Sequence, residues 1–406
     1  MPAVTAGRVI FVNRHYWPSE AATAQLLTDL AEGLAGCGWT VTVLTSRGGP
    51  GAEPPEDDRH GVHVIRLRAT RWGRRSLAGK ACDYLTFSLA CRRALPGRLA
   101  AHDRLVAMTD PPALAALVAT AGRSADVAVV HWIQDIHPEI TIALPGHPVL
   151  KRLSGPWIRR RDAAWKNARA CVAISEEMAA VVAEHGVAAD RIRVLPNWAP
   201  AGPSVATAAP AENALRREWR LTDQFVVAYS GNLGRVHALE PVLEAADRLR
   251  GEPGLMFLFA GDGPQRARLE QSAAARRLTN VRFLPAQPRA RLAESLSAGD
   301  VHLITLRSGC ERYVYPSKLY GVLAVGRPIL FVGSPHGGLA AEVHRRGAGM
   351  VAADDSPDAI AAAVRTLRGN PERRADMGRA AADWHRATGG FSAALAKWEE
   401  LLRDLR

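Results

Sequence analysis

The chain has 406 residues, of which 48% are hydrophobic and 23% are charged. This length exceeds one ordinary hydrophobic core, so we expect two domains, and the composition excludes a fibrous or fully disordered protein. The sequence has no apolar run of transmembrane length and no signal-peptide pattern at residues 1–8. Its five scattered cysteines form neither a metal-binding spacing nor a disulfide framework. We therefore expect a cytoplasmic protein.

The net charge of +12 comes almost entirely from arginine, because the chain has only five lysines. Such an excess suits nucleic acid, anionic lipid or phosphorylated substrates. An Arg-rich and Ala-rich codon usage would produce the same excess with no functional meaning, since the positive charge is spread along the whole chain. The charge by itself therefore selects no partner.

Short apolar runs in the first half predict an α/β domain. A loop that contains Tyr16 and Trp17 follows the first run, and an amphipathic helix at about 24–34 leads to the second. β-α-β units at this spacing are typical of a doubly wound parallel sheet. We place this domain at 1–198 and a Pro/Ala-rich linker at 199–215. The predicted strands span residues 8–13, 40–45, 62–67, 105–108, 127–132, 170–174 and 192–195.

Polar side chains follow the strand predicted at 127–132, namely Asp135, His137 and Glu139. Ligands of open α/β sheets bind beyond the carboxyl ends of the strands. These three residues could therefore supply an acid, a base or contacts to sugar hydroxyls. A pair of loop-capping carboxylates and a surface histidine would give the same pattern, and the sequence alone weighs the two interpretations about evenly.

Two stretches are rich in basic residues. Residues 66–98 carry nine arginines and lysines around the apolar run 84–90, and residues 151–169 predict a basic helix. A basic amphipathic helix can lie on an anionic membrane surface. It can equally bury its apolar side in the core and expose its arginines to water. We expect the apolar face of 84–90 to point to the core and the arginine cluster to contact a membrane.

The α/β pattern restarts in the second half, which predicts a second domain at 216–375 and C-terminal helices at 376–406. Only helical patterns are expected after residue 351, and they include about 371–386 and 391–405. The predicted strands of this half span residues 224–229, 255–260, 281–284, 301–306 and 329–332.

Three loops of the second domain suit a nucleotide. Residues 230–235 and 261–263 are glycine-rich turns that follow strands, where backbone N–H groups can approach a phosphate. Residues 308–318 carry Glu311 and end in Pro316-Ser317-Lys318 at the start of a predicted helix, which also suits a phosphate. An ordinary loop–helix–strand unit with a surface lysine would look similar, but three such loops at one sheet edge favour a nucleotide site.

These motifs resemble the retaining nucleotide-sugar glycosyltransferases of family 4, which have the GT-B fold. The resemblance covers nearly the whole chain and is closest to the branch that builds bacterial cell-surface polysaccharides. It implies two Rossmann-like doubly wound domains that face a central cleft, with the donor in the second domain, the acceptor in the first, and a last helix that crosses back onto the first. The matching segments are residues 134–139, 194–198, 229–235, 260–264, 280–285 and 316–328.

The resemblance also implies roles for individual residues. The implied catalytic residues are Asp135, His137, Glu311 and Lys318. The implied acceptor-binding residues are Tyr16, Trp17 and Glu139. The implied donor-binding residues are Gly231, Asn232, Arg235, Gly261, Asp262, Gly263, Leu284, Pro285, Ser317, Lys318 and Glu342.

The chain departs from the family pattern at four positions. Asn232 and His237 stand where many members carry an arginine and a lysine for the diphosphate, so that Arg235 and Lys318 would take over. Gly321 stands where many members carry the glutamate that holds the ribose, which makes Glu342 a candidate substitute. Gln134 stands where many members carry a histidine, next to Asp135 and His137.

Glycosyl transfer requires stabilisation of the negative charge that grows on the leaving diphosphate, which cations and helix-end N–H groups can provide. The sequence has no Asp-x-Asp motif, so we expect metal-independent catalysis and no cofactor. Retention is implied by the family, through attack on the same face, in which a diphosphate oxygen takes the acceptor proton.

We expect transfer of a sugar from a nucleotide-sugar, with UDP as the expected carrier, to a lipid-linked or other saccharide acceptor in cell-envelope glycan synthesis. The expected location is the cytoplasm or the inner face of the cell membrane. The alternatives are transfer to a small-molecule natural product, a GT-B nucleotide-sugar epimerase that uses Asp135, His137 and Glu139, and a basic binding protein without enzymatic activity. The lack of a nucleic-acid-binding motif argues against a nucleic-acid partner.

Overall fold

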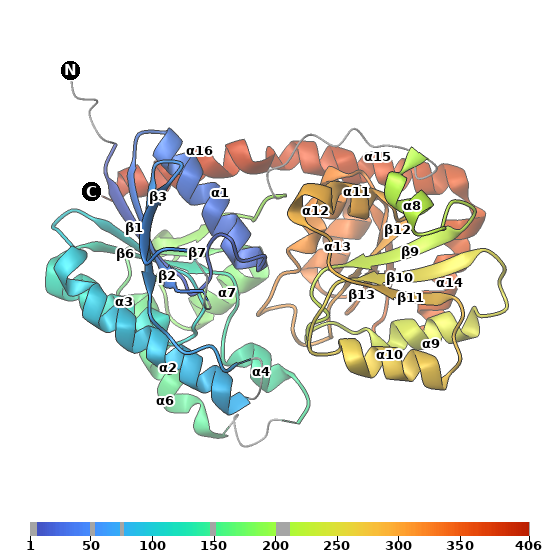
Figure 1. Ribbon diagram of the computed structural model, residues 1–406, viewed down its shortest axis with the longest axis horizontal. Coiled ribbons are helices and arrows are strands. Elements are labelled where there is room, and N and C mark those ends of the chain that lie inside the picture. The colour runs from blue at the N-terminus through green and yellow to red at the C-terminus, as the bar shows by residue number, and fades with distance from the viewer. Residues whose placement is uncertain (1–5, 49–52, 74–76, 147–151, 200–211, 406) are drawn as a thin grey trace. The chain divides into compact units, whose positions relative to one another are not determined.

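The structure is a computed structural model that describes residues 6–48, 53–73, 77–146, 152–199 and 212–405. The chain divides into two compact units, each built on its own sheet (Figure 1). Unit 1 comprises Met1–Asn197, Arg312–Tyr315 and Ser392–Arg406, and unit 2 comprises Trp198–Glu311 and Pro316–Phe391. Most of the linker predicted at 199–215 lies outside the described residues, as do Arg74, Arg75 and Lys151 of the two basic stretches.

Unit 1 contains a sheet that has, within the described ranges, eight strands in the order β3-β4-β2-β1-β5-β6-β7-β8. The strands are parallel except for β3, which pairs antiparallel with β4. The direction of winding reverses between β1 and β5, where Val9 lies opposite Val41 on one side and Arg104 on the other. The strands are β1 (Arg8–Val12), β2 (Thr40–Ser46), β3 (Glu56–Arg59), β4 (Val62–Leu67), β5 (Arg104–Ala107), β6 (Ala128–Ile133), β7 (Ala170–Ala173) and β8 (Ile192–Val194).

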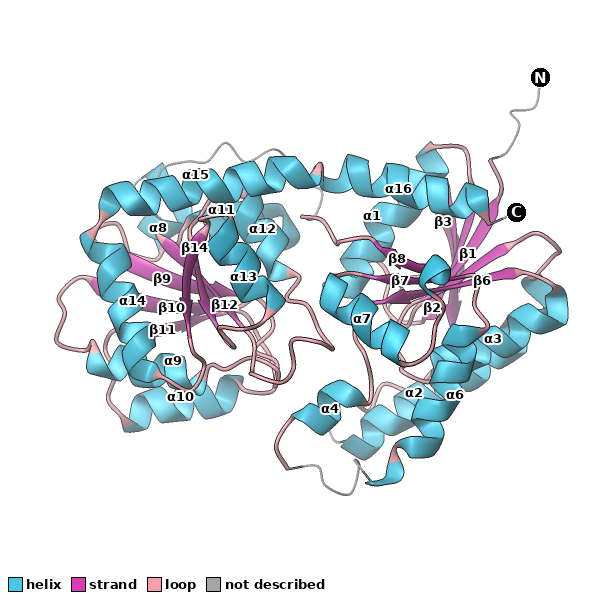
Figure 2. Ribbon diagram, turned by 180° about the vertical axis from the view of Figure 1, so that it is seen from behind, coloured by secondary structure: helices cyan, strands magenta, loops and turns pink. Residues whose placement is uncertain are grey.

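Helices cover the sheet of unit 1 (Figure 2). The core beneath α2 contains Ile10, Phe87 and Leu105, all fully buried. The residues of α16 from Ser392 onward also belong to this unit, and Trp398 packs edge to face on Trp132 with ring centroids 4.9 Å apart. The helices are α1 (Ala22–Gly36), α2 (Leu77–Ala94), α3 (Leu114–Ala125), α4 (Glu139–Ala143), α6 (Gly155–Lys166), α7 (Glu176–Glu184) and α16 (Gly390–Asp404).

Unit 2 contains a parallel sheet with, in the part that the structure describes, six strands in the order β11-β10-β9-β12-β13-β14. These are β9 (Phe225–Ser230), β10 (Leu255–Ala260), β11 (Val281–Leu284), β12 (Val301–Thr305), β13 (Ile329–Val332) and β14 (Gly349–Ala352). The helices are α8 (Ala214–Glu218), α9 (Glu240–Arg248), α10 (Arg266–Ala275), α11 (Leu292–Ser297), α12 (Lys318–Ala324), α13 (Gly338–Arg345), α14 (Pro357–Gly369) and α15 (Pro371–Thr388).

The expected fold class, two doubly wound α/β domains, is confirmed. Two strands were not expected from the sequence. β3 has the sequence Glu-Asp-Asp-Arg and forms at the sheet edge, where pairing with β4 alone requires no apolar face. β14 is short and begins at Gly349, where a Cβ atom would stand 2.0 Å from the carbonyl oxygen of Ile329 on β13. Within the described ranges no helix is both long and apolar enough to cross a bilayer.

Candidate active site

The sheet of unit 2 has its change of winding between β9 and β12. The chain runs from β9 through β10 to β11 on one side, and from β12 through β13 to β14 on the other. Ligands of open parallel sheets bind at such a point, beyond the carboxyl ends of the strands. The loops that follow Ser230 and Thr305 are therefore the first place to look for a ligand site.

Two glycine turns pack against each other at this edge. The N–H of Gly231 donates to the carbonyl of Ala260 at 2.9 Å. A Cβ atom on Gly261 would stand 2.0 Å from the oxygen of Gly231, and one on Gly263 would stand 2.5 Å from Oδ1 of Asn232. Both glycines also have φ near +150°, so no other residue fits without displacing the turns. The turns that the sequence singled out thus form one compact structure.

Lys318, the first residue of α12, lies beside these turns. Its Nζ atom is 3.4 Å from the centroid of the Tyr229 ring, and its Cε atom would be 3.6 Å from a Cβ on Gly231. The nitrogen is buried and has no hydrogen-bond acceptor within the described part of the chain. Burial lowers the pKa of Lys318 well below its ordinary value, because no carboxylate offsets the cost of desolvation. An anion bound beside this nitrogen would therefore favour the charged form of the lysine.

His237 completes the group around Tyr229. Its ring meets the Tyr229 ring edge to face, with centroids 5.7 Å apart, and its Nδ1 atom donates to the carbonyl of Thr305 at 2.6 Å. Burial, and next the charge of Lys318, lower the pKa of His237 well below its ordinary value. The histidine is therefore neutral, and it ties the loop after β9 to the end of β12.

The other predicted donor residues lie on the same loops. Asn232, Arg235 and Asp262 are exposed. The hydroxyl of Tyr229 donates to the carbonyl of Asn232 at 2.6 Å, and the N–H of Gly263 donates to Oδ1 of Asp262 at 2.7 Å. Leu284 ends β11 and Pro285 follows it, and the carbonyl of Leu284 accepts the N–H of Gly261 at 3.1 Å. Ser317 precedes Lys318 and makes no side-chain cap on α12.

The two predicted carboxylates of unit 2 differ in their surroundings. Glu311 has its Oε1 atom buried without a hydrogen-bond partner among the residues that the structure describes, and its Cγ atom would be 3.3 Å from a Cβ on Gly337. Glu342 pairs with Arg345 at 2.6 Å and Arg346 at 2.9 Å on its own helix. A ribose contact by Glu342 would therefore have to compete with two guanidinium groups.

The winding of unit 1 reverses between β1 and β5, and charged residues gather after these two strands. Asp110 pairs with His15 at 3.0 Å and with Arg14 at 3.2 Å. Burial raises the pKa of Asp110, but the His15 hydrogen bond and the Arg14 charge outweigh burial and leave the pKa below its ordinary value. Tyr84 of α2 packs on Arg14, with the guanidinium carbon 5.1 Å from the ring centroid.

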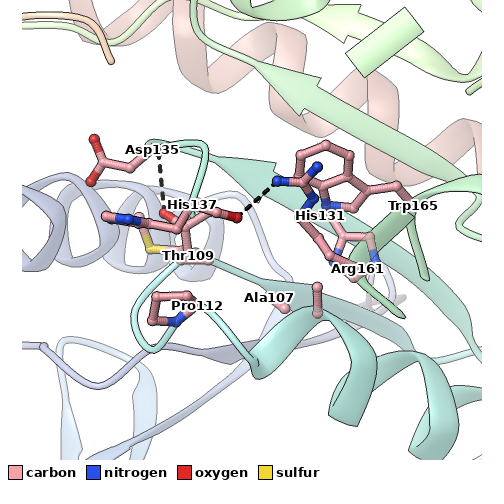
Figure 3. Close-up of a pocket in the computed structure, with 10 residues that line it drawn as sticks. Ala107, Thr109, Pro112, His131, Asp135, His137, Arg161 and Trp165 are labelled. Atoms are coloured by element: carbon pink, nitrogen blue, oxygen red, sulfur yellow. Dashed lines mark hydrogen bonds between the residues drawn. The ribbon is translucent and has the colours of Figure 1, made fainter. Parts of the chain in front are cut away.

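Asp135 and His137 follow β6 and lie near this group. The N–H of Asp135 donates to Oγ1 of Thr109 at 3.3 Å, and Figure 3 shows the side chains of Asp135 and His137 extending to the same side. Burial raises the pKa of Asp135 and lowers that of His137. Burial thus shifts each group toward its neutral form.

A cavity beside this pair is lined by residues that include Thr109, His131, His137 and Trp165 (Figure 3). Its volume is about 20 Å³, which is the space of a single water-sized sphere or little more. The Nε2 atom of His131 is buried there without a hydrogen-bond partner in the described ranges, and burial lowers the pKa of His131 to about 4. This cavity can hold a water molecule but not a sugar.

Glu139 and Trp17, two of the predicted acceptor residues, contact arginines within unit 1, and the third, Tyr16, is buried there. Glu139 forms a two-point ion pair with buried Arg161, at 2.5 and 2.8 Å. The guanidinium carbon of Arg59 lies 3.9 Å from the ring centroid of Trp17, so the two side chains pack together. Tyr16 is only 3% exposed, and burial raises its pKa above the ordinary value. The sequence analysis left Arg14, His15 and Asp110 out of the site, although all three follow predicted strands.

A short segment from the loop after β12 also belongs to this group. The N–H of Ile136 donates to the carbonyl of Tyr313 at 2.8 Å, and Asp135 forms an antiparallel bridge with Val314. Arg312 of the same segment pairs with Glu184 of α7. Residues 312–315 thus pack in unit 1, although their neighbours along the chain, Glu311 and Pro316, belong to unit 2.

Two protein-family models match the chain, one for each half. The model described as glycosyl transferase 4-like domain matches residues 22–198, and the model described as glycosyl transferases group 1 matches residues 212–384. The chain belongs to the two-domain glycosyltransferases. Its expected assignment to the family-4 type of these glycosyltransferases is thereby confirmed.

Individual proteins resemble parts of this glycosyltransferase. The putative colanic acid biosynthesis glycosyl transferase WcaI of Escherichia coli (strain K12) is 42% identical over 154 residues, which is 38% of each chain. The probable glycosyltransferase WbjE of Pseudomonas aeruginosa is 29% identical over 36% of this chain and 35% of its own length. A 2-deoxystreptamine glucosyltransferase of Streptomyces kanamyceticus is 29% identical over 65% of this chain and 67% of its own length. The chain thus aligns with well under half of the first two relatives.

Solved structures establish the fold. A sucrose-phosphate synthase from Thermosynechococcus elongatus matches with a TM-score of 0.78 over 98% of this chain and 99% of its own, at 18% sequence identity. HepE of Anabaena, solved in complex with UDP, matches with a TM-score of 0.71 over 98% of this chain and all of its own, at 15% identity. The glycosyltransferase therefore has the expected GT-B fold.

Proposed function

We propose that the protein is a retaining, metal-independent glycosyltransferase that moves a sugar from a UDP-linked donor to a lipid-linked or other saccharide acceptor in cell-envelope glycan synthesis. The observation that carries the proposal is the side-chain nitrogen of Lys318, which is buried beside the glycine turns of the group 1 domain with no hydrogen-bond acceptor among the described residues. Charging a buried amine without a partner is costly, and a nucleoside diphosphate would supply the negative charge that offsets this cost.

The donor diphosphate would lie against the turn that contains Gly231, beside the side chain of Lys318. As the bond from the sugar to the diphosphate breaks, negative charge grows on the leaving oxygen. A fixed cation in a site that excludes water stabilises this charge more strongly than it would in solution. Bound diphosphate would also restore the charge of Lys318, whose pKa burial depresses in the free protein.

The acceptor would meet the charged residues of unit 1. Its hydroxyl attacks the anomeric carbon on the face that the diphosphate leaves, and its proton passes to the departing phosphate oxygen. This route requires no protein nucleophile and no metal. Asp135 and His137 would then orient the acceptor hydroxyls by hydrogen bonds, while Asp110, held by Arg14 and His15, fixes the loops around them.

The relatives support the class of donor and acceptor. WcaI and WbjE are named as glycosyltransferases, WcaI for colanic acid, and HepE was solved with UDP. The 2-deoxystreptamine glucosyltransferase aligns with a larger share of this chain and supports a second candidate, transfer to a small-molecule natural product. The two candidates share the donor site and differ only in the acceptor.

The test combines donor binding with turnover. A thermal-shift panel of UDP, GDP, ADP and dTDP should show stabilisation by one nucleotide, UDP in our expectation, because a ligand that binds only the folded state raises its stability. Acceptor-dependent release of UDP, unaffected by EDTA, would then support the transferase. Epimerisation of the donor without release of UDP would contradict the transferase and favour an epimerase. If no nucleotide stabilises the protein, the proposal of a donor site around Lys318 is wrong.

A further inference from the structure

The outer face of α2 exposes apolar side chains that a globular protein normally buries. In the part of the chain that the structure describes, the exposed large hydrophobic residues are Trp72, Leu85, Leu89 and Leu153, at 55%, 60%, 42% and 68% exposure. Three of these four lie on or directly before α2. The sequence analysis expected the apolar run 84–90 to face the core, which holds for Phe87 but not for Leu85 and Leu89.

Two of these side chains, Leu85 and Leu89, form a stripe along α2 with two arginines. Successive residues of a helix turn by about 100°, so Leu85 and Leu89 lie almost above each other and Arg92 and Arg93 follow one turn later. Both arginines are exposed, as are Arg68 and Arg71 before the helix. The single acidic residue of α2, Asp83, is buried. The stripe therefore combines apolar and cationic groups without a carboxylate.

Trp72 is held against α2 by its own loop. The carboxylate of Asp83 accepts the N–H groups of Trp72 and Gly73, at 2.8 and 2.9 Å. The hydroxyl of Thr86 accepts the N–H of Thr70 at 3.0 Å. The backbone of this loop is thus fixed on α2, and the indole is displayed outward although the loop itself is anchored. A tryptophan next to arginines is typical of a membrane–water interface.

The opposite side of α2 belongs to the candidate acceptor site. Lys80 lies 5.5 Å from the centroid of the Tyr84 ring, and Tyr84 packs on Arg14 beside Asp110. One helix therefore carries site residues on one side and the apolar, cationic stripe on another. A lipid-linked acceptor whose lipid stays in the bilayer would present its headgroup to the side of Lys80 and Tyr84.

We propose that Trp72 and the stripe of Leu85, Leu89, Arg92 and Arg93 dock on an anionic lipid bilayer. The charge pattern selects this occupant, because cations interleaved with apolar side chains match an anionic headgroup layer above acyl chains. Three apolar side chains are few for a stable protein interface, which buries about 800 Å² on each partner. Arg66 and Arg161, in the two basic stretches, are buried and paired within unit 1 and take no part.

The proposal rests on the proposed function and extends it, because a lipid-linked acceptor lies in a membrane. Binding to vesicles is nevertheless measured without donor or acceptor. Failure of vesicle binding would leave the UDP thermal shift as an independent test of the transferase. The full chain is floated with vesicles of phosphatidylcholine alone and of equal parts phosphatidylcholine and phosphatidylglycerol. We expect binding to the anionic vesicles only, and weaker binding as salt is added.

Two double variants test the two parts of the stripe. Leu85→Gln with Leu89→Gln should weaken vesicle binding by about tenfold or more, because two apolar side chains no longer enter the bilayer. Arg92→Gln with Arg93→Gln should weaken it by a similar factor at low salt. The charge-matched control is Arg379→Gln with Arg386→Gln on α15, whose side chains are 70% and 74% exposed and should retain binding. The stabilisation by UDP in the thermal-shift measurement should persist in all three double variants.

Depth of insertion gives a second measurement that does not depend on affinity. Brominated lipids quench tryptophans that reach the acyl chains, so vesicle-bound protein should lose fluorescence, and Trp72→Phe should abolish most of that loss. Vesicle binding that is unchanged in the leucine variant, or that falls equally in the α15 control, would overturn the proposal. A dimer that the leucine variant dissociates would overturn it in favour of a second copy of the chain.

Discussion

Lys318 begins α12 and Gly231 follows β9, and a Cβ atom on Gly231 would stand 3.6 Å from Cε of Lys318. The lysine stem thus lies along the glycine turn, while its ammonium group rests on the ring of Tyr229. A cation–π contact of this kind partly offsets the loss of water around an ammonium group. It does not replace an anion, which is why this pair of residues defines the proposed donor site.

Replacing Lys318 with methionine should separate activity from stability. Turnover should fall by about 100-fold or more, since one charge that stabilises the leaving group is lost. The melting temperature without nucleotide should stay unchanged or rise, because methionine fills the same space without a buried charge. UDP should no longer stabilise the variant in a thermal-shift measurement.

The matched control for this prediction is Lys397→Met, which changes an exposed lysine of α16. It should retain both turnover and the UDP shift. If the Lys318→Met variant keeps wild-type turnover, Lys318 takes no part in the reaction. A variant that loses its folded structure without nucleotide would instead assign Lys318 a structural role.

Gly261→Ala should disrupt the two glycine turns that contain Gly231 and Gly261. The new Cβ atom would stand 2.0 Å from the oxygen of Gly231, at a φ of +151° that alanine rarely adopts. We expect the turns to shift, unfolding free energy to fall by about 1–3 kcal/mol, and the affinity for UDP to drop with it. Urea denaturation and UDP titration measure the two effects.

Gly251→Ala is the control for the glycine prediction, since a Cβ atom there meets nothing within 4 Å and its φ is not in the left-handed region. Its unfolding free energy should stay within about 0.5 kcal/mol of the wild type. Equal effects of the two substitutions would show that the close approach of Gly261 to Gly231 does not shape the site.

Asp110 should make unit 1 sensitive to acid. Its pKa in the folded protein is below the ordinary 3.8. A depressed carboxyl pKa contributes stability that is fully present above the unfolded value, and that is lost as the pH falls through the folded one. Asp110→Asn should therefore be less stable than the wild type at neutral pH, and the difference should shrink in acid, starting near the ordinary value of 3.8.

The measurement is the melting temperature of both proteins over a series of pH values from neutral to about pH 3. Asp126→Asn serves as the control, because Asp126 is exposed and its left-handed conformation also suits asparagine. Its difference from the wild type should be small at every pH. A constant difference for Asp110→Asn would mean that the ion pairs with Arg14 and His15 do not depend on the ionised carboxylate.

Much of the fold follows from the sequence, because buried parallel strands are continuous apolar runs. Val-Ile-Phe-Val in β1 and Leu-Met-Phe-Leu-Phe-Ala in β10 need no knowledge of their partners to be recognised. The glycine turns and Lys318 could also be predicted from the sequence, because they directly follow or precede such runs. β3 could not be predicted, because its residues Glu56–Arg59 are polar and only the edge position makes them a strand.

The surroundings of individual side chains depend on contacts between distant residues and could not be predicted. Glu139 follows a strand like a site residue, yet Arg161, 22 positions later, holds its carboxylate. Asp110 gains its partners only because β1 and β5 are neighbours in the sheet. Periodicity gives the same apolar signal for Phe87 and Leu89, although one is buried in the core and the other is exposed.

Trp398→Ala should destabilise unit 1 selectively. Trp398 is fully buried and packs edge to face on Trp132, and Arg104 donates from Nε to the carbonyl of Leu402 in the next turn of α16. Removal of a buried tryptophan leaves a cavity and costs about 3–5 kcal/mol of unfolding free energy. Lys397→Ala, an exposed neighbour on the same helix, should cost almost nothing.

The proposed donor site supplies a readout that separates the two units in this experiment. Trp398 belongs to unit 1, whereas the turns around Gly231 and Lys318 belong to unit 2. Urea unfolding of Trp398→Ala should therefore show an early transition for unit 1, followed by a later transition that UDP still shifts upward. A single early transition that UDP does not affect would mean that the core formed by α16 supports both units together, and that the donor domain cannot fold without it.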